Sequence, residues 1–273
     1  EIITGLVGSE MCIRDRAEIF PTRVFPEAVG LKKIDKETLL GYGAMVFNAL
    51  GPDNEFRKDA MAKGLSVLEK INKQCLEENI DTKGLAKEIY RSIAENSEED
   101  QLAGMLVRSL LSAGIDTTVS AIGNLLWCFA DNPEQFQLVK NDKSLVGNAV
   151  EESLRLTSPV KAFCRTSATD TEVSGVTIEE GTKILCVLGS ANTDPEVWEN
   201  SYKYDVTRRT IGHLALGVGV HNCVGQTLAR AEITALVSSL TELVQVINPA
   251  GKATWKPNNA MRSLESLPII LET

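Results

Sequence analysis

The feature that most constrains the fold is the long run from Gln101 to Ala130. Its only charged residues are Arg108 and Asp116, and most of the others are apolar. As one continuous helix the run would span about 45 Å. A helix that is apolar on every side is buried by neighbouring elements, so the run predicts a large domain with this helix at its centre. A buried carboxylate is costly without partners, and Asp116 therefore needs an explanation.

The second informative feature is a glycine-rich run that directly precedes an apolar helical segment, residues 226–247. Its glycines, histidine and cysteine alternate with other residues: Gly217, Gly219, His221, Cys223 and Gly225. Glycine lets the backbone approach a flat partner closely and adopts positive φ readily. A cysteine at the start of a helix lies at the positive end of its dipole, which favours the thiolate. The run predicts a thiolate site for a soft metal or a metal macrocycle; a buried structural cysteine is the alternative.

This run resembles the haem-binding loop of the cytochrome P-450 family. The resemblance implies haem b as the cofactor, dioxygen as a co-substrate and Cys223 as the iron ligand, whose thiolate favours O–O cleavage. It also implies that Gly217, Gly219 and Gly225 cradle the haem. The loop departs from the family pattern at Leu216, where the family usually has Phe.

The segment around Asp116 is similar to the central-helix motif of the same family. It reads Ala113-Gly114-Ile115-Asp116-Thr117-Thr118. The resemblance implies that Ala113 and Gly114 open a groove for dioxygen, and that Asp116 and Thr117 act as catalytic residues that relay protons. The alternative is structural, with Thr117 bonded back to a helix carbonyl and Asp116 in a buried salt bridge.

A Glu-x-x-Arg sequence, Glu152 to Arg155, lies between these two motifs. Residues three apart share a helix face, so the two side chains can pair. The order and spacing before the cysteine loop resemble the family's structural pair, which locks to a later arginine. Arg208 fits that third position, and the resemblance gives all three a structural role in holding the loop that presents Cys223.

The rest of the chain predicts more helices and several short strands, hence a mainly α fold with small β-sheets. The expected helices are two within residues 35–79, a short one starting at Pro133, one at 144–157 and one at 226–247. The expected strands lie at 160–164, 173–178 and 183–188, with a hairpin at 258–268. By resemblance the first two helices form a lid over the haem pocket and the hairpin tip reaches the active site; two ordinary amphipathic helices would show the same spacing as the lid.

The resemblance also assigns contacts around the haem. By this resemblance Arg165 binds a haem propionate, and His213 and His221 also approach the propionates. The contact of a guanidinium or an imidazole N–H with a carboxylate is charge-assisted and therefore strong. A surface arginine is the alternative for Arg165. The segment from Val160 to Phe163 lines the pocket.

The substrate is predicted from the central helix. Ser109, Ser112 and Asp116 lie at i, i+3 and i+7, on one stripe that would face the pocket. Arg108 is a cation inside a buried helix and demands an anionic partner. The chain most resembles the bacterial branch that oxidises para-substituted benzoates, which implies that Arg108 and the serines help to hold the substrate carboxylate. Alternatively Arg108 extends to solvent or pairs with a protein carboxylate across to the lid helices.

The sequence pattern of residues 1–16 differs from that of the rest of the chain. These residues resemble a translated sequencing adapter, and they end in Met11-Cys12-Ile13-Arg14-Asp15-Arg16. We expect the native part to be residues 17–273, a partial domain without the N-terminal portion of the family fold. The missing wall is expected to leave Leu111, Ile115 and Val160 open to water and to make the chain a poor haem protein.

Composition narrows the function further. A net charge of −9 disfavours a nucleic-acid partner, the 6 cysteines form no C-x-x-C pair, and no uncharged apolar stretch of about 18 residues suggests a membrane span. We expect a soluble, cytoplasmic monomer that inserts one oxygen atom into a small organic substrate, with electrons from a ferredoxin or a flavin-containing reductase. The alternatives are a haem-free fragment without activity, or a peroxygenase or isomerase on the same fold. The latter is disfavoured because Asp116 and Thr117 are both present.

Overall fold

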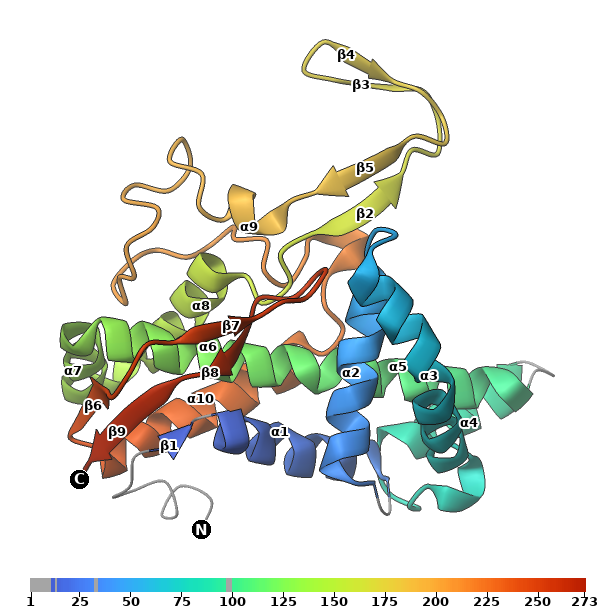
Figure 1. The fold of residues 1–273 in the computed structure, drawn as a ribbon, viewed down its shortest axis with the longest axis horizontal. Coiled ribbons are helices and arrows are strands. Elements are labelled where there is room, and N and C mark those ends of the chain that lie inside the picture. The colour runs from blue at the N-terminus through green and yellow to red at the C-terminus, as the bar shows by residue number, and fades with distance from the viewer. Residues whose placement is uncertain (1–10, 13, 32–33, 97–99) are drawn as a thin grey trace.

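The computed structural model describes residues 11–12, 14–31, 34–96 and 100–273, and it shows a mainly helical fold with short strands, as predicted (Figure 1). The α-helices are α1 (Arg14–Val29), α2 (Lys36–Ala49), α3 (Glu55–Gln74), α4 (Leu85–Asn96), α5 (Asp100–Gly114), α6 (Asp116–Asp131), α7 (Pro133–Asn141), α8 (Val146–Thr157), α9 (Leu188–Ala191) and α10 (Gln226–Leu243). Short 3₁₀ turns are η2 (Glu77–Asn79), η3 (Lys143–Leu145) and η4 (Gly219–His221).

The strands form small antiparallel sheets. They are β1 (Met11–Cys12), β2 (Phe163–Thr166), β3 (Thr171–Val173), β4 (Val176–Ile178), β5 (Lys183–Cys186), β6 (Val246–Pro249), β7 (Thr254–Lys256), β8 (Ser263–Ser266) and β9 (Pro268–Glu272). One sheet has the order β1-β9-β6, and the others are the pairs β2-β5, β3-β4 and β7-β8. In Figure 1 the β2-β5 ribbon extends away from the helices, whereas β7-β8 lies along α6.

The central run is two helices rather than the single one predicted. α5 ends at Gly114, α6 begins at Asp116, and Ile115 lies between them with φ −96° and ψ −65°. The Thr117 hydroxyl donates to the Ala113 carbonyl (2.6 Å) and the Thr118 hydroxyl to the Gly114 carbonyl (2.9 Å). These hydroxyls donate to carbonyls to which backbone N–H groups donate in a continuous helix, and such competition often bends helices.

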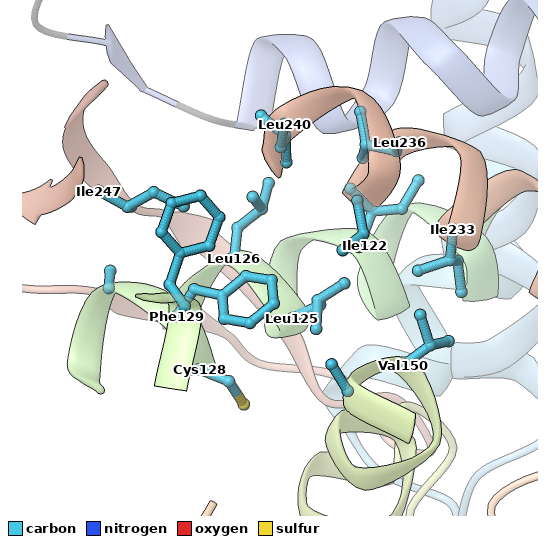
Figure 2. Close-up of a cluster of buried hydrophobic side chains, with 14 of the residues drawn as sticks. Ile122, Leu125, Leu126, Cys128, Phe129, Val150, Ile233, Leu236, Leu240 and Ile247 are labelled. Atoms are coloured by element: carbon cyan, nitrogen blue, oxygen red, sulfur yellow. The ribbon is translucent and has the colours of Figure 1, made fainter. Parts of the chain in front are cut away.

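The prediction that this run is buried on all sides is wrong for α5 but holds for most of α6. Met105 and Leu106 of α5 are 51% and 41% exposed, whereas α6 packs against α8 and α10 around the main core. Figure 2 shows Leu125 and Phe129 of α6 pointing into this cluster, which Val150 of α8 and Ile233 of α10 complete. By length and composition Leu102–Asp131 could cross a membrane, but a buried core helix passes the same test, and α6 is one.

A second core lies under the predicted lid. Leu111 and Ile115 are buried there, at 1% and 0% exposure, among side chains of α1, α2 and α3. The expectation that these two residues are open to water is therefore wrong, because Phe25 of α1 and Leu39 of α2 cover them. Val160 is partly buried against Phe47 and Met261.

The predicted helix at 226–247 ends earlier, at Leu243. Val246–Pro249 instead pairs with β9 in an antiparallel register, with Ile247 opposite Leu271. Two lysines cap the end of α10: Lys143 Nζ donates to the Thr241 carbonyl (2.9 Å) and Lys140 Nζ to the Val244 carbonyl (2.7 Å). Cations at a helix C-terminus satisfy its last carbonyls and oppose its dipole, so the helix stops where they bind.

The described residues before Ala17 belong to elements of the fold. α1 runs from Arg14 through the boundary expected after Arg16, and Met11 pairs with Ile269 of β9. The origin of residues 1–16 therefore stays a prediction, and no element ends at its boundary. The sequence Ser97-Glu98-Glu99-Asp100 resembles a helix capping box, but it lies mostly outside the described residues.

The tip of the β7-β8 hairpin is fastened to the connection between α2 and α3. The Asn259 side chain donates to the Asn48 carbonyl (2.8 Å), and its backbone N–H donates to Asn48 Oδ1 (3.1 Å). Asn54 Nδ2 donates to Asn259 Oδ1 (2.6 Å). The hairpin thus joins the connection between α2 and α3, and in Figure 1 α2 crosses the α5–α6 run near its break.

Candidate active site

The Cys223 loop is closed by short backbone hydrogen bonds. The Cys223 N–H donates to the Leu216 carbonyl (2.8 Å), and the Gly217 N–H donates to the Leu214 carbonyl (3.0 Å). Gly225 is the N-cap residue of α10, so Cys223 lies two residues before the N-cap. Its side chain is half-buried. The loop therefore presents the thiol at the positive end of the helix, as predicted from the sequence.

Two of the three predicted glycines are required by backbone conformation. Gly217 has φ +75° and Gly219 has φ +61°, values that favour glycine. A Cβ atom at Gly217 would also collide with the His221 carbonyl oxygen, whereas Gly219 has open space around it. Gly225 has an ordinary φ of −81°, and a Cβ there would make a 4.0 Å contact with Cys223 Sγ. That distance is an ordinary van der Waals contact, so neither backbone conformation nor packing in this structure requires glycine at position 225.

The break between α5 and α6 brings the other predicted residues together. Thr117 bonds back to Ala113, which is the structural alternative for this threonine. Ala113 is exposed, whereas Gly114 faces inward: a Cβ there would collide with the Phe25 ring. Gly114 is thus required by packing, and the role of these residues toward dioxygen stays a prediction.

Asp116 lies beneath α2 and beside a small cavity. Gly43 of α2 contacts its side chain closely. The cavity lies between α1, α2, α6 and the β7-β8 hairpin. Its polar lining consists of Glu18, Asp116, Ser120, Lys256, Asn258 and Ser263. A carboxylate in such a position can exchange a proton with polar groups while α2 covers it.

Glu152, Arg155 and Arg208 form one connected network. Arg155 donates to both Glu152 oxygens, through Nε (2.7 Å) and Nη2 (2.9 Å), with both side chains fully buried. Arg208 Nε donates to Glu152 Oε1 (2.9 Å). Arg208 also binds the Glu199 carbonyl (2.6 Å), and Arg155 binds the Asn192 carbonyl (2.6 Å). The network holds the irregular segment 192–208 against α8.

The residues predicted to reach the propionates lie in different surroundings. His213 is predicted to approach a propionate, but its ring is buried against Glu151, with Nε2 2.9 Å from Glu151 Oε2. His221 is exposed in η4 next to the Cys223 loop. Arg165 is exposed on β2, donates to the Cys164 carbonyl and stacks over the Phe163 ring at 5.9 Å. Its contact with a propionate stays a prediction.

The predicted substrate residues are divided between two settings. Arg108 Nη1 donates to Asn72 Oδ1 of α3 (2.6 Å), so it points toward a lid helix, as the alternative proposed, but its partner is a neutral amide. The Ser109 and Ser112 hydroxyls bond back to the helix carbonyls of Met105 and Ser109. Val160 contacts the tip of the β7-β8 hairpin, where it forms an isolated antiparallel β-bridge with Met261.

A comparison with models of known protein families supplies the deciding observation. The model described as Cytochrome P450 matches residues 43–271, a range that contains the helix break, the Glu152 network and the Cys223 loop. This chain belongs to the cytochrome P450 family.

Individual relatives agree. Cytochrome P450 CYP199A2 of Rhodopseudomonas palustris is 44% identical over 264 residues, which cover 97% of this chain and 64% of that protein. The structure of P450BioI in complex with an acyl carrier protein ligated to hexadec-9Z-enoic acid matches with a TM-score of 0.88 and 26% identity, covering 99% of this chain and 71% of that one. Cytochrome P450 CREJ shares the fold (TM-score 0.89, 24% identity, 99% and 70% covered). This chain thus spans about two thirds of the length of these P450s.

The residues around Cys223 fit the haem that the P450 family implies. Val220 and Val224, on either side of the cysteine, are 97% and 92% exposed, which gives an apolar face beside a single soft sulfur. Among the described residues no cluster of three or more His, Cys, Asp or Glu side chains could hold a metal ion. One thiolate on an apolar face suits a macrocycle that supplies the remaining metal ligands itself.

Several residues of this P450 site were not found from the sequence. Phe25 and Gly43 act through packing, and Asn259 acts through hydrogen bonds, with residues far away in the chain. No local pattern marks these contacts. Glu151 precedes the predicted Glu152, and an acidic pair on a helix gives no sign that the two carboxylates bind different partners. Gly43 alone has a weak sequence signal. A glycine inside a helix lowers the helix stability, so its presence there indicates that another element packs closely against it.

Proposed function

We propose that this chain carries the oxygen-activating part of a haem-thiolate monooxygenase. The observation that supports it most is the Cys223 thiol, half-buried in a loop turned by Gly217 and Gly219 and flanked by exposed valines, in a member of the P450 family. Haem b, when bound, would supply the iron at which dioxygen is activated. Cys223 would hold the iron, and the Glu152 network would keep the loop in place.

The spectrum of the reduced, carbon-monoxide-bound protein tests this assignment. Haem-reconstituted wild-type protein should give a thiolate-type Soret band, and Cys223→Ser should lose it, because a serine hydroxyl does not supply the soft thiolate. Cys164→Ser, on the exposed strand β2, is the matched control and should keep the band. A thiolate-type band in Cys223→Ser would refute the assignment.

In this proposal Asp116 and Thr117 move protons. The Thr117 hydroxyl, held by the Ala113 carbonyl, lies on the first turn of α6. The Asp116 carboxylate would pass protons between its oxygens and the polar groups of the cavity, which include Glu18 and Lys256. α2 covers Asp116 and limits water there, which keeps proton transfer confined to these groups.

The substrate would be a small organic anion, and a para-substituted benzoate fits the proposal. Arg108 is half-buried, and among the described residues it forms no ion pair; its partner is the Asn72 amide. The Tyr42 hydroxyl lies beside both Arg108 and Ser112. A guanidinium with spare donors next to hydroxyl groups suits a carboxylate.

Titration with 4-methoxybenzoate and its uncharged methyl ester tests the substrate class. The acid should bind more tightly to the haem-reconstituted protein, and Arg108→Gln should remove most of that preference. Arg91→Gln, at an exposed pair on α4, is the control for loss of charge. Equal affinity for the acid and the ester would remove the carboxylate from the proposal.

The partners follow from the same family. Electrons would come from a ferredoxin or a flavin-containing reductase, and the protein would work as a soluble cytoplasmic monomer. Support for this comes from the bacterial source of the similar P450s and from the burial of α6, which forms the second half of the apolar run Leu102–Asp131.

A further inference from the structure

The Glu151 carboxylate joins three segments of the chain. It lies on α8 next to Glu152, but it binds different partners. Arg230 of α10 approaches it with two nitrogens, Nε to Oε1 (2.6 Å) and Nη2 to Oε2 (3.0 Å). His213 Nε2 lies 2.9 Å from Oε2. Arg230 Nη1 also binds the Gln226 side chain (2.7 Å), in the first turn of α10.

These contacts are partly shielded from water. The side chain of Glu151 is 23% exposed and that of His213 is 6% exposed. Burial alone would raise the pKa of Glu151, but hydrogen bonds from His213 and Arg230 outweigh it and lower this pKa to about 2. Glu151 in turn raises the pKa of Arg230. A two-pronged arginine–carboxylate contact fixes geometry as well as charge.

Cys223 lies between the two partners of Glu151 in the chain. His213 precedes the cysteine loop, and its Nδ1 accepts a hydrogen bond from the Ala215 N–H (3.2 Å). The next residue, Leu216, supplies the carbonyl that binds the Cys223 N–H (2.8 Å). Arg230 follows the loop on α10. One carboxylate therefore closes residues 213–230 into a ring that contains Cys223.

The neighbouring Glu152 does not perform this task. Its partners are Arg155 on the same helix and Arg208, which hold the segment before His213. The two consecutive glutamates of α8 thus hold two successive segments. Glu152 holds residues 192–208, and Glu151 holds residues 213–230.

We propose that Glu151 is a positioning residue for Cys223, because it holds both ends of the cysteine loop through His213 and Arg230. The proposal rests on the proposed function for its meaning, since a fixed loop matters when Cys223 binds the haem iron. The clamp itself is a property of the folded chain and can be measured separately.

The first test is the alkylation rate of Cys223 in the 273-residue chain, followed by mass spectrometry of the peptides. Glu151→Gln should raise the Cys223 rate about tenfold, because charge-assisted hydrogen bonds to a partly buried group are lost. Cys164, exposed on β2, is the internal reference and should react at an unchanged rate. Glu134→Gln, which removes an exposed carboxylate from α7, should change neither rate.

A double-variant comparison guards against general unfolding. Arg230→Gln should raise the Cys223 rate as Glu151→Gln does, and the double variant should be no worse than the more severe single one, because both break the same contact. Glu151→Asp, which keeps the charge on a shorter side chain, should restore part of the protection. An unchanged Cys223 rate in Glu151→Gln, or equal acceleration at Cys164, would overturn the proposal.

The second test reads the haem site. In reconstituted protein Glu151→Gln should lower the fraction of thiolate-type absorbance in the reduced carbon-monoxide complex, and Glu134→Gln should not. An unchanged fraction would overturn the positioning role. If wild-type protein showed no thiolate-type band while Glu151→Gln still exposed Cys223, the proposed function would fail and the clamp would stand.

Discussion

Gly43 of α2 packs directly against Asp116 of α6, so closely that a Cβ atom at position 43 would lie 2.7 Å from the Asp116 Cβ. Gly41, on the same helix, has nothing within 4 Å of the corresponding position. The two glycines therefore differ in purpose: the first lets α2 cover the acidic residue of the site, and the second only weakens the helix.

Alanine substitution separates the two glycines. Gly43→Ala should destabilise the chain by about 1–3 kcal/mol, because the methyl group overpacks the contact with Asp116. Gly41→Ala should stabilise it by about 0.5–1 kcal/mol, because alanine favours the helix. Urea unfolding of both variants measures these changes, and a shift of the same sign in both would contradict the packing argument.

Thr117 and Thr118 make the same kind of hydrogen bond but should differ in function. Thr117→Ala should uncouple electron flow from product formation in the reconstituted enzyme, with little change in substrate affinity. Thr118→Ala also loses a hydroxyl bonded to the preceding turn, yet it should keep the ratio of product to reductant consumed. The measurement is that ratio, and an unchanged value in Thr117→Ala would rule out the proton-transfer role.

Glu232 should make stability fall as pH rises. Both of its carboxylate oxygens are buried without a hydrogen-bond partner among the described residues, and burial raises its pKa from 4.5 to about 7. Between these values the folded chain keeps the proton that the unfolded chain loses, so this group's contribution is full below pH 4.5 and is lost through pH 7. The loss is at most about 3.5 kcal/mol, at about 1.4 kcal/mol per pKa unit.

Glu232→Gln removes this titration without changing the shape of the side chain. The variant should be more stable than wild type at pH 8 and should lack the wild-type decline between about pH 4.5 and 7. Glu242→Gln, exposed on the same helix, should leave the pH profile as it is. Unfolding free energies across this pH range check the prediction, and parallel curves for wild type and Glu232→Gln would contradict it.

The chain holds two Glu-x-x-Arg sequences whose arginines should contribute very differently to the free energy of unfolding. Glu152–Arg155 is fully buried, whereas Glu88–Arg91 has the same spacing and both side chains are exposed. Arg155→Leu should cost about 3–5 kcal/mol because it leaves a buried carboxylate without its main partner. Arg91→Leu should cost less than about 1 kcal/mol. Denaturant titration of the two variants gives the comparison; similar losses would show that burial is not decisive here.

The comparison of these two Glu-x-x-Arg sequences also shows how much of the candidate site the sequence could predict. Spacing alone does not distinguish Glu152–Arg155 from Glu88–Arg91; only the former lies between the Asp116 motif and the Cys223 loop. The fold class followed from the helical and strand patterns together with the family resemblance, and the positive φ of Gly217 and Gly219 agrees with the tolerance expected of glycine in that loop. These features need no knowledge of distant residues.

The remainder depends on contacts that no local pattern contains. The break at Ile115 arises because the Thr117 hydroxyl competes for a helix carbonyl, an outcome that threonine propensity alone does not determine. His213 binds Glu151 because folding brings together residues 62 positions apart. Arg108 turned toward α3 for the same reason, since Asn72 comes from another helix.

The fastening of Asn259 to Asn48 and Asn54 has a consequence for the order of folding. These contacts join residues 205 and 211 positions apart, whereas α2 and α3 meet through a short turn. Closing a loop of that length costs more entropy than closing a hairpin, and contacts so distant in sequence form slowly. The helices over the site can therefore pair early, but they reach their final place only when the last residues of the chain have folded back onto them.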